Sequence, residues 1–151
     1  MACTNADSVI DALMRLHRGD VHAGRELEAF QCSPEASAVA LELLRSVVAE
    51  VQFFAASTIY RIATRPDGTG QSINLDWLLA QACRCEHRPA ARQLIAATVA
   101  LTGADGKPAL AAQAVELLAD EAHWQLAVDL LLAIEPPPPT LGVCALLSTW
   151  L

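Results

Sequence analysis

Aromatic and charged residues are both scarce in this sequence. Phe, Trp and Tyr make up 5% of its 151 residues, and Asp, Glu, Lys and Arg make up 18%. Aromatic and β-branched side chains favour strands, whereas Ala and Leu, which dominate the apolar residues here, favour helices. Apolar residues reach 54%, which is enough to form a core. We therefore expect an ordered helical protein without a β-sheet.

Targeting and cross-linking features are also missing. The first residues lack a basic region followed by an apolar stretch, so we expect no signal peptide. No apolar run approaches the roughly 18 residues that a membrane span needs. Five cysteines form an odd number without framework spacing, which favours a reducing compartment. The predicted localisation is the cytoplasm and nucleus, without membrane insertion.

Basic charge is in short supply as well. Ten Lys and Arg against seventeen Asp and Glu give a net charge of −7. An acidic surface repels phosphate backbones, so we expect no direct binding of nucleic acid. The same charge suits a basic protein partner, although it also serves simply to keep an Ala-rich chain soluble.

No pattern of catalytic or metal-binding residues stands out. Cys83 and Cys85 are separated by one residue, whereas zinc sites place about two to four residues between cysteines and need four ligands in all. Residues 103–108 resemble a phosphate-binding loop only superficially, because two residues separate the glycines and Pro108 follows the lysine. The four histidines have no Ser or Cys partner at a defensible spacing. We predict no enzyme activity, no metal and no cofactor.

Helical periodicity, by contrast, recurs along the whole chain. Ser33 with Pro34, Pro89 and Pro108 are typical of helix starts. Residues 64–72 and 103–106 are typical of turns, and the four prolines at 136–139 end the eighth helix. Residues 141–151 would form a ninth. Apolar residues three or four apart mark the eight segments 9–16, 27–30, 36–44, 51–62, 75–82, 94–101, 111–118 and 124–134.

The spacing of these helices predicts a repeat architecture. The helices come in pairs, and a new pair starts roughly every 35 to 40 residues, which is typical of a helical solenoid. A four-helix bundle would have fewer and longer helices. We predict an all-α superhelix of antiparallel helix pairs, a HEAT-like solenoid of about four repeats that takes in residues 1–151 as one segment.

Two strings resemble the N-terminal HEAT repeats of the importin-β family of nuclear transport receptors, in its transportin-SR and exportin-like branch. FQCSPEA at residues 30–36 is similar to the link between the first two repeats, and VQFFAASTI at residues 51–59 is similar to the second inner helix. Ser37 and Ser57 depart from the aromatic residue and the Gln that are common there. Because family members hold many more repeats, the chain resembles the N-terminal piece of a longer receptor.

The resemblance implies a role in nucleocytoplasmic protein transport. In that family the small GTPase Ran docks in its GTP form on inner helices, which would be residues 23–31, 48–63 and 89–102 here. Protein cargo and nucleoporins are further expected partners if the chain is part of a full-length receptor. The alternative is a generic HEAT or armadillo-type scaffold unrelated to transport, which the composition and the repeat period favour equally.

The candidate contact residues lie on the fourth predicted helix, away from its main apolar stripe. Phe53, Ala56 and Tyr60 share a second face by their i, i+3, i+7 spacing, and Gln52 and Arg61 flank that face. Exposed aromatic and arginine side chains are typical of interface anchors. The alternative is that Phe53 and Tyr60 pack on the neighbouring repeat. Phe54, on the main stripe, is expected to be buried between repeats.

Overall fold

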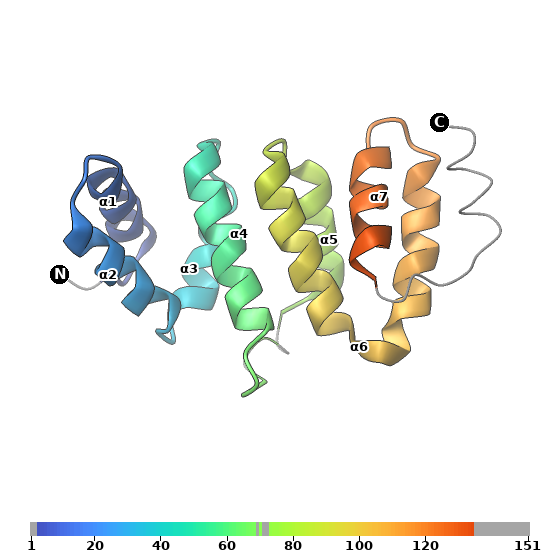
Figure 1. The fold of residues 1–151 in the computed structure, drawn as a ribbon, viewed down its shortest axis with the longest axis horizontal. Helices are drawn as coiled ribbons and strands as arrows, with labels where there is room; N and C mark the ends of the chain where they lie inside the picture. Colours follow the sequence, from blue (N-terminus) through green and yellow to red (C-terminus); the bar gives the residue numbers. More distant parts are fainter. Residues whose placement is uncertain (1–2, 69, 71–72, 135–151) are drawn as a thin grey trace.

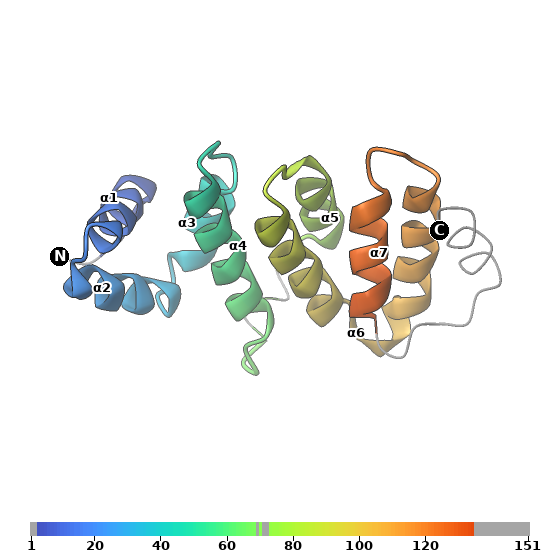
Figure 2. The same ribbon diagram turned by 45° about the horizontal axis from the view of Figure 1, so that its top comes forward.

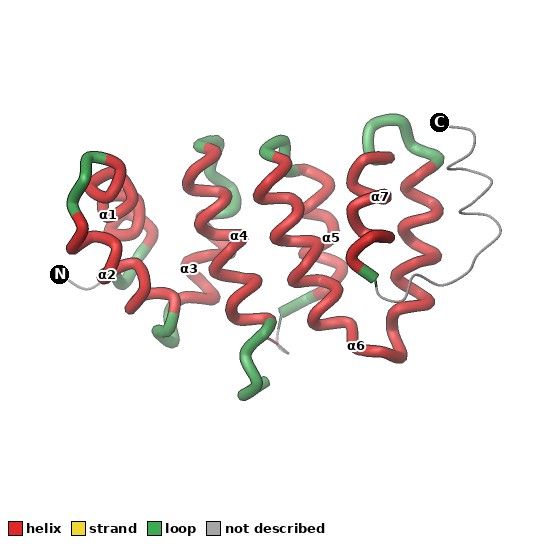
Figure 3. The backbone as a smooth tube through the Cα atoms, in the orientation of Figure 1, coloured by secondary structure: helices red, strands yellow, loops and turns green. Residues whose placement is uncertain are grey.

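The protein is described by a computed structural model that covers residues 3–68, 70 and 73–134. Within these ranges it consists of helices joined by turns, with no strand (Figure 3). The all-helical class predicted from composition and periodicity is confirmed. The helices are α1 (Ala6–His17), α2 (Val21–Gln31), α3 (Ala36–Leu43), α4 (Ala49–Ala63), α5 (Leu75–Arg84), α6 (Arg88–Leu118) and α7 (Trp124–Ala133).

Helix α6 consists of two helices that meet at Gly103. Its backbone angles there are φ 72° and ψ 172°, a conformation that is essentially restricted to glycine. The chain therefore reverses at this residue, and the two halves of α6 form separate rods (Figure 1). With both halves counted, residues 3–134 hold the eight helices that were predicted for them. The predicted ninth helix, 141–151, lies outside the described residues.

Two predicted helix starts are wrong. Helix α3 begins at Ala36, because the Ser33 hydroxyl does not cap it and instead donates a hydrogen bond of 2.6 Å to the Phe30 carbonyl at the end of α2. The second half of α6 is helical directly after Gly103, so Pro108 lies inside the helix and not at its first position. Side-chain caps do start other helices, and Asn5, Asp20 and Asn74 each accept a hydrogen bond from a backbone N–H of the first turn.

The helices form hairpins that follow one another in a row (Figures 1 and 2). Helix α1 packs on α2, α3 on α4, α5 on the first half of α6, and the second half of α6 on α7. Helix α4 also packs extensively along α6. The first hairpin meets the second through much smaller contacts of α1 with α3 and of α2 with α4. None of the helices in the described ranges is long and apolar enough to span a membrane.

The core runs along the whole row. Its small members include Ala55, Ala56, Ala90 and Ala97, which are fully buried on α4 and α6 and let these two helices approach closely. Phe54, which was expected to be buried between repeats, does lie between two hairpins, where its ring stacks on Phe30 with the centroids 6.1 Å apart, but it is only half-buried. The largest fully buried apolar side chains are Phe30, Ile59, Ile62, Leu78, Leu94, Ile95, Leu118, Leu130, Ile134 and Val9.

Candidate partner-binding surface

Helix α4 has one side that faces solvent. It packs on α3, on α6 and, near its middle, on α2, and these contacts bury Val51, Ala55 and Ile59. The exposed residues of α4, together with the half-buried Ser57, are spaced three, four or seven apart and therefore form a single stripe along the helix. This exposed stripe of α4 consists of Glu50, Phe53, Ser57, Tyr60 and Arg61, of which Ser57 is half-buried and the others are exposed.

Two aromatic rings lie on the exposed stripe. Phe53 is 41% exposed and Tyr60 is 37% exposed, which is unusual for large aromatic side chains. The Phe53 ring meets the His87 ring edge-on with the centroids 6.3 Å apart, so it is held in place by the N-cap residue of α6. The Phe53 and His87 rings border a hollow of about 340 Å³ that Leu13, Glu50, Phe54 and Ser57 also line. Of the two alternatives for Phe53, packing on the neighbouring repeat is met in part: the ring contacts His87 of the next hairpin, but the side chain stays 41% exposed.

Two of the five candidate residues do not face solvent in the way that was predicted. Ala56 is fully buried, and Gln52 is half-buried with its amide donating to the Ser46 carbonyl. Gln52 and Ala56 each come directly before a stripe residue in the sequence. Successive residues of a helix are rotated by about 100°, so these two side chains are turned towards the packed side. The residues that take their places are Glu50 and Ser57, which stand three before and four after Phe53.

The stripe carries opposite charges at its two ends. Glu50 lies in the first turn of α4 and Arg61 in the last, which is the arrangement that the helix dipole favours. Neither forms an ion pair with any residue that the structure describes. Both charges are thus free to meet a partner. Nearby Arg65 is already engaged within the protein, because its guanidinium donates a hydrogen bond to the Gln31 carbonyl at the end of α2.

Cys83 and Cys85 lie at the end of α5, and Cys85 is next to Gln52 of α4. Burial raises the pKa of Cys85 and of Cys83 above the ordinary value. The Cys85 sulfur lies 3.6 Å from Gln52 Oε1 and 3.4 Å from the His87 carbonyl oxygen. A thiol with a raised pKa is a poor nucleophile at neutral pH. Across residues 3–134, as far as they are described, no group of three or more His, Cys, Asp or Glu is placed to hold a metal ion.

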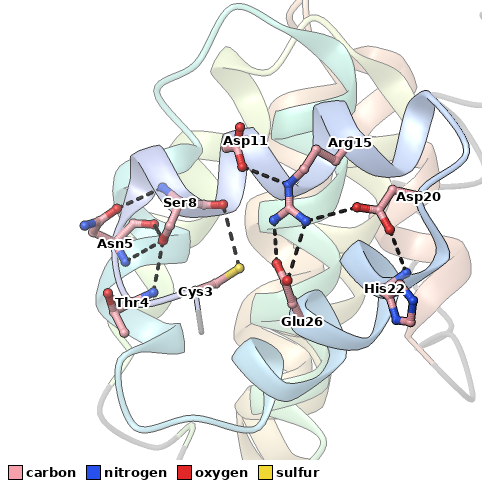
Figure 4. A network of polar contacts seen from close by, with 9 residues as sticks. All are labelled: Cys3, Thr4, Asn5, Ser8, Asp11, Arg15, Asp20, His22 and Glu26. Atoms are coloured by element: carbon pink, nitrogen blue, oxygen red, sulfur yellow. Dashed lines mark hydrogen bonds and ion pairs between the residues drawn. The ribbon is translucent and has the colours of Figure 1, made fainter. Parts of the chain in front are cut away.

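A polar cluster in the first hairpin has a structural role instead (Figure 4). Arg15 of α1 donates to Asp11 at 2.9 Å, to Asp20 at 3.2 Å and to Glu26 at 2.5 Å. The Arg15 hydrogen bond lowers the pKa of Glu26, and the backbone N–H of His22, followed by Arg15, lowers that of Asp20. With three carboxylates around it, Arg15 holds α1 against α2 and has little capacity left for an anionic partner.

Comparison of the chain with protein-family models, with curated proteins and with solved structures finds no match. The assignment of a function therefore rests on the residues and the geometry described above.

Proposed function

We propose that this chain is the N-terminal part of an importin-β-like nuclear transport receptor and that it binds the GTPase Ran in its GTP form. The observation that carries the proposal is the position of the exposed stripe. Phe53 lies within residues 51–59, the string that resembles the family's second inner helix, and Tyr60 and Arg61 follow it directly. The part of the sequence with the most distinctive resemblance is thus also the part that presents aromatic rings to solvent.

The arrangement of the hairpins supports a binding role. In this proposal the row is a HEAT-like solenoid in which α2, α4, the first half of α6 and α7 are the inner helices. A row of inner helices makes an extended surface that contacts a globular partner at several points. Phe53 and Tyr60 supply contact area with few rotatable bonds, and Arg61 supplies a charge and several donors. Such side chains contribute most of the binding energy in many interfaces.

The test compares the two nucleotide states of Ran. The chain is titrated by calorimetry with Ran loaded with a non-hydrolysable GTP analogue and with Ran loaded with GDP. We expect binding in the micromolar range to the GTP state and at least about tenfold weaker binding to the GDP state. The double variant Tyr60→Ala, Arg61→Ala should weaken the GTP-state complex about tenfold or more. Arg45→Ala, which removes an exposed arginine outside the stripe, is the matched control.

Two results would contradict this proposal. Equal affinity for both nucleotide states would remove the link to transport, and so would the absence of binding at about 100 µM Ran. Either result would favour the generic helical scaffold. If Arg61→Ala alone unfolds the protein in a thermal melt, then Arg61 is a structural residue and does not belong to the contact surface.

A further inference from the structure

An apolar groove lies between α1 and the start of α4. It has a volume of about 630 Å³ and is lined on one side by Ile10, Leu13, Met14 and Leu16 of α1, and on the other by Val48 and Val51. Met14, Leu16 and Val48 are between 42% and 52% exposed, so a large part of the lining is in contact with solvent. Exposed apolar surface of this kind is typical of interaction sites.

The groove exists because α1 has two apolar faces and only one of them is covered. Val9 and Ala12 are fully buried in the core. Ile10, Leu13 and Met14 follow the spacing of a second face, which points towards the second hairpin. The contacts between these two hairpins are small, and the second face of α1 therefore remains half-buried or exposed.

We propose that this groove is the docking site for an amphipathic α-helix of a protein partner. The partner helix carries Leu, Met or Phe on one face, an acidic residue at the end that lies over Arg18, and a basic residue that lies over Glu50. Helix-in-groove recognition of this kind anchors apolar side chains at i, i+3, i+4 and i+7 in a trough between helices. A flexible Met14 in the lining allows the groove to adapt its shape.

The openness of the groove argues against a small molecule as its occupant. Pockets for small ligands bury roughly 70–90% of the ligand surface, and a trough whose own lining is half exposed does not enclose a ligand to that extent. One wall is a helix and the other is the first turn of a helix. A third helix can pack against such walls at the usual separation of about 8–10 Å.

The charges at the groove define the polarity of the partner. His17 and Arg18 lie at the C-terminal end of α1, and Glu50 lies on the opposite wall. In the part of the chain that the structure describes, neither Arg18 nor Glu50 forms an ion pair. The chain as a whole carries a charge of −7, so the cationic end of the groove is a local exception. This end favours a partner helix that places a carboxylate over it.

This site goes beyond the proposed Ran contact. The groove involves Glu50 in the first turn of α4, whereas Tyr60 and Arg61 lie in the last turns of that helix. Eleven residues separate Glu50 from Arg61, which corresponds to about 16 Å along a helix. Glu50 belongs to both surfaces, so the groove is tested with variants of Val48 and Arg18 and the stripe with variants of Tyr60 and Arg61. With these variants, failure of one proposal is distinguishable from failure of the other.

The test uses a synthetic peptide as the probe. A fluorescein-labelled amphipathic helix of about 18 residues carries Leu on one face, two Glu near one end and two Lys near its centre. Its binding to the full chain is measured by fluorescence anisotropy, beside a scrambled peptide of the same composition and a peptide with Glu and Lys exchanged. We expect only the first peptide to bind, with a dissociation constant in the range of about 1–100 µM.

Neighbouring valines supply a matched pair of variants. Val48 lines the groove and is 49% exposed, whereas Val47 does not line it and is 95% exposed. Val48→Asp should weaken peptide binding about tenfold or more because it places a charge in the apolar trough, and Val47→Asp should leave binding unchanged. Arg18→Glu should weaken binding of the first peptide and strengthen binding of the charge-exchanged one. Circular dichroism spectra establish that each variant is folded.

Three outcomes would overturn the proposal. The first is the absence of peptide binding at about 100 µM protein. The second is an equal loss of binding in Val47→Asp and Val48→Asp. The third is a dimer in light scattering that Val48→Asp abolishes and Val47→Asp does not, because the groove would then hold a second copy of this chain. Ran binding, measured in parallel, should be unaffected by Val48→Asp.

Discussion

The joint between the first and second hairpins differs from the joint between the second and third. In the first joint, α2 and α4 are linked by a few specific interactions. These are the stacked rings of Phe30 and Phe54, and a buried hydrogen bond of 3.0 Å from the Gln31 amide to the Thr58 hydroxyl. In the second joint, α4 and the first half of α6 lie along each other and bury alanines and aliphatic side chains between them.

This difference shows how a row of hairpins can be stable and still present a binding surface. Close packing of α4 on α6 stabilises the centre of the row but leaves no apolar surface open between these helices. The first joint makes smaller contacts, and the apolar second face of α1 therefore stays accessible. Specific contacts at a small interface are more sensitive to substitution than dispersed ones, because few other interactions compensate for each loss.

Phe30→Ala should give the largest effect on stability. The Phe30 side chain is 1% exposed and contacts α4 through its ring stack, so its removal leaves a cavity at the first joint. We expect a loss of about 3–5 kcal/mol in the free energy of unfolding, measured by urea denaturation. Phe53→Ala is the matched control and should cost less than about 1 kcal/mol, because Phe53 is 41% exposed in the folded protein whereas Phe30 is 1% exposed. Similar costs for both variants would show that the first joint has little energetic importance.

Two buried threonines provide a direct comparison of the joints. Thr58 and Thr98 each donate a hydrogen bond of 2.8 Å to the carbonyl four residues earlier, but only Thr58 also accepts one from another helix. Thr58→Val leaves the buried Gln31 amide without its acceptor and should cost about 1–3 kcal/mol. Thr98→Val should cost less than about 1 kcal/mol.

The double variant Gln31→Leu, Thr58→Val sharpens this test. It removes both partners of the hydrogen bond, so part of the stability lost in Thr58→Val should return. If the stability lost in the double variant equals the sum of the losses in Gln31→Leu and Thr58→Val, the hydrogen bond does not couple the hairpins.

Acid should weaken the first hairpin before the rest of the row. Folding lowers the pKa of Asp20 and of Glu26 below their ordinary values of 3.8 and 4.5, so the folded state binds protons less readily than the unfolded chain. Their stabilisation is complete above these ordinary values and is lost as the pH falls through the lowered ones. Amide hydrogen exchange across this pH range should show α1 opening first. Arg15→Gln should reduce the pH dependence, whereas Arg92→Gln should leave it unchanged.

Arg92→Ala should give the smallest effect. Its guanidinium lies 3.5 Å from Asp129 and is largely exposed, and Arg88 contacts the same carboxylate at 3.5 Å. A surface ion pair with a second cation beside it contributes little, so we expect a change within about 0.5 kcal/mol in thermal or urea denaturation. A larger loss would show that the ion pairs between α6 and α7 hold the end of the row, in contrast to the apolar packing between α4 and α6.

Periodicity in the sequence was sufficient to predict the helices, because each one is a local structure whose apolar residues recur every three or four positions. The turn residues at 103–106 predicted a break in this region, but the structure confines it to Gly103, where only glycine adopts the observed angles without strain, and residues 104–106 are helical. The sequence pattern was not sufficient for the start of α3. The Ser33 hydroxyl can accept from a backbone N–H of the following helix or donate to the Phe30 carbonyl, and the choice depends on how α2 ends. Of the candidate residues, Phe53, Tyr60 and Arg61 lie on the exposed side of α4 and Gln52 and Ala56 do not. The helical spacing left open whether Phe53 and Tyr60 face solvent or a neighbouring repeat.

The sequence by itself determined that the described residues are helical and how many helices they form. Only the tertiary structure decided which side of α4 faces solvent and which face of α1 remains uncovered. The physical reason is that a helix with apolar residues on two faces carries no signal in its own sequence for which face finds a partner. That choice depends on how closely neighbouring hairpins pack, and residues far apart in the chain, such as Phe30 with Phe54 and Gln31 with Thr58, set that distance.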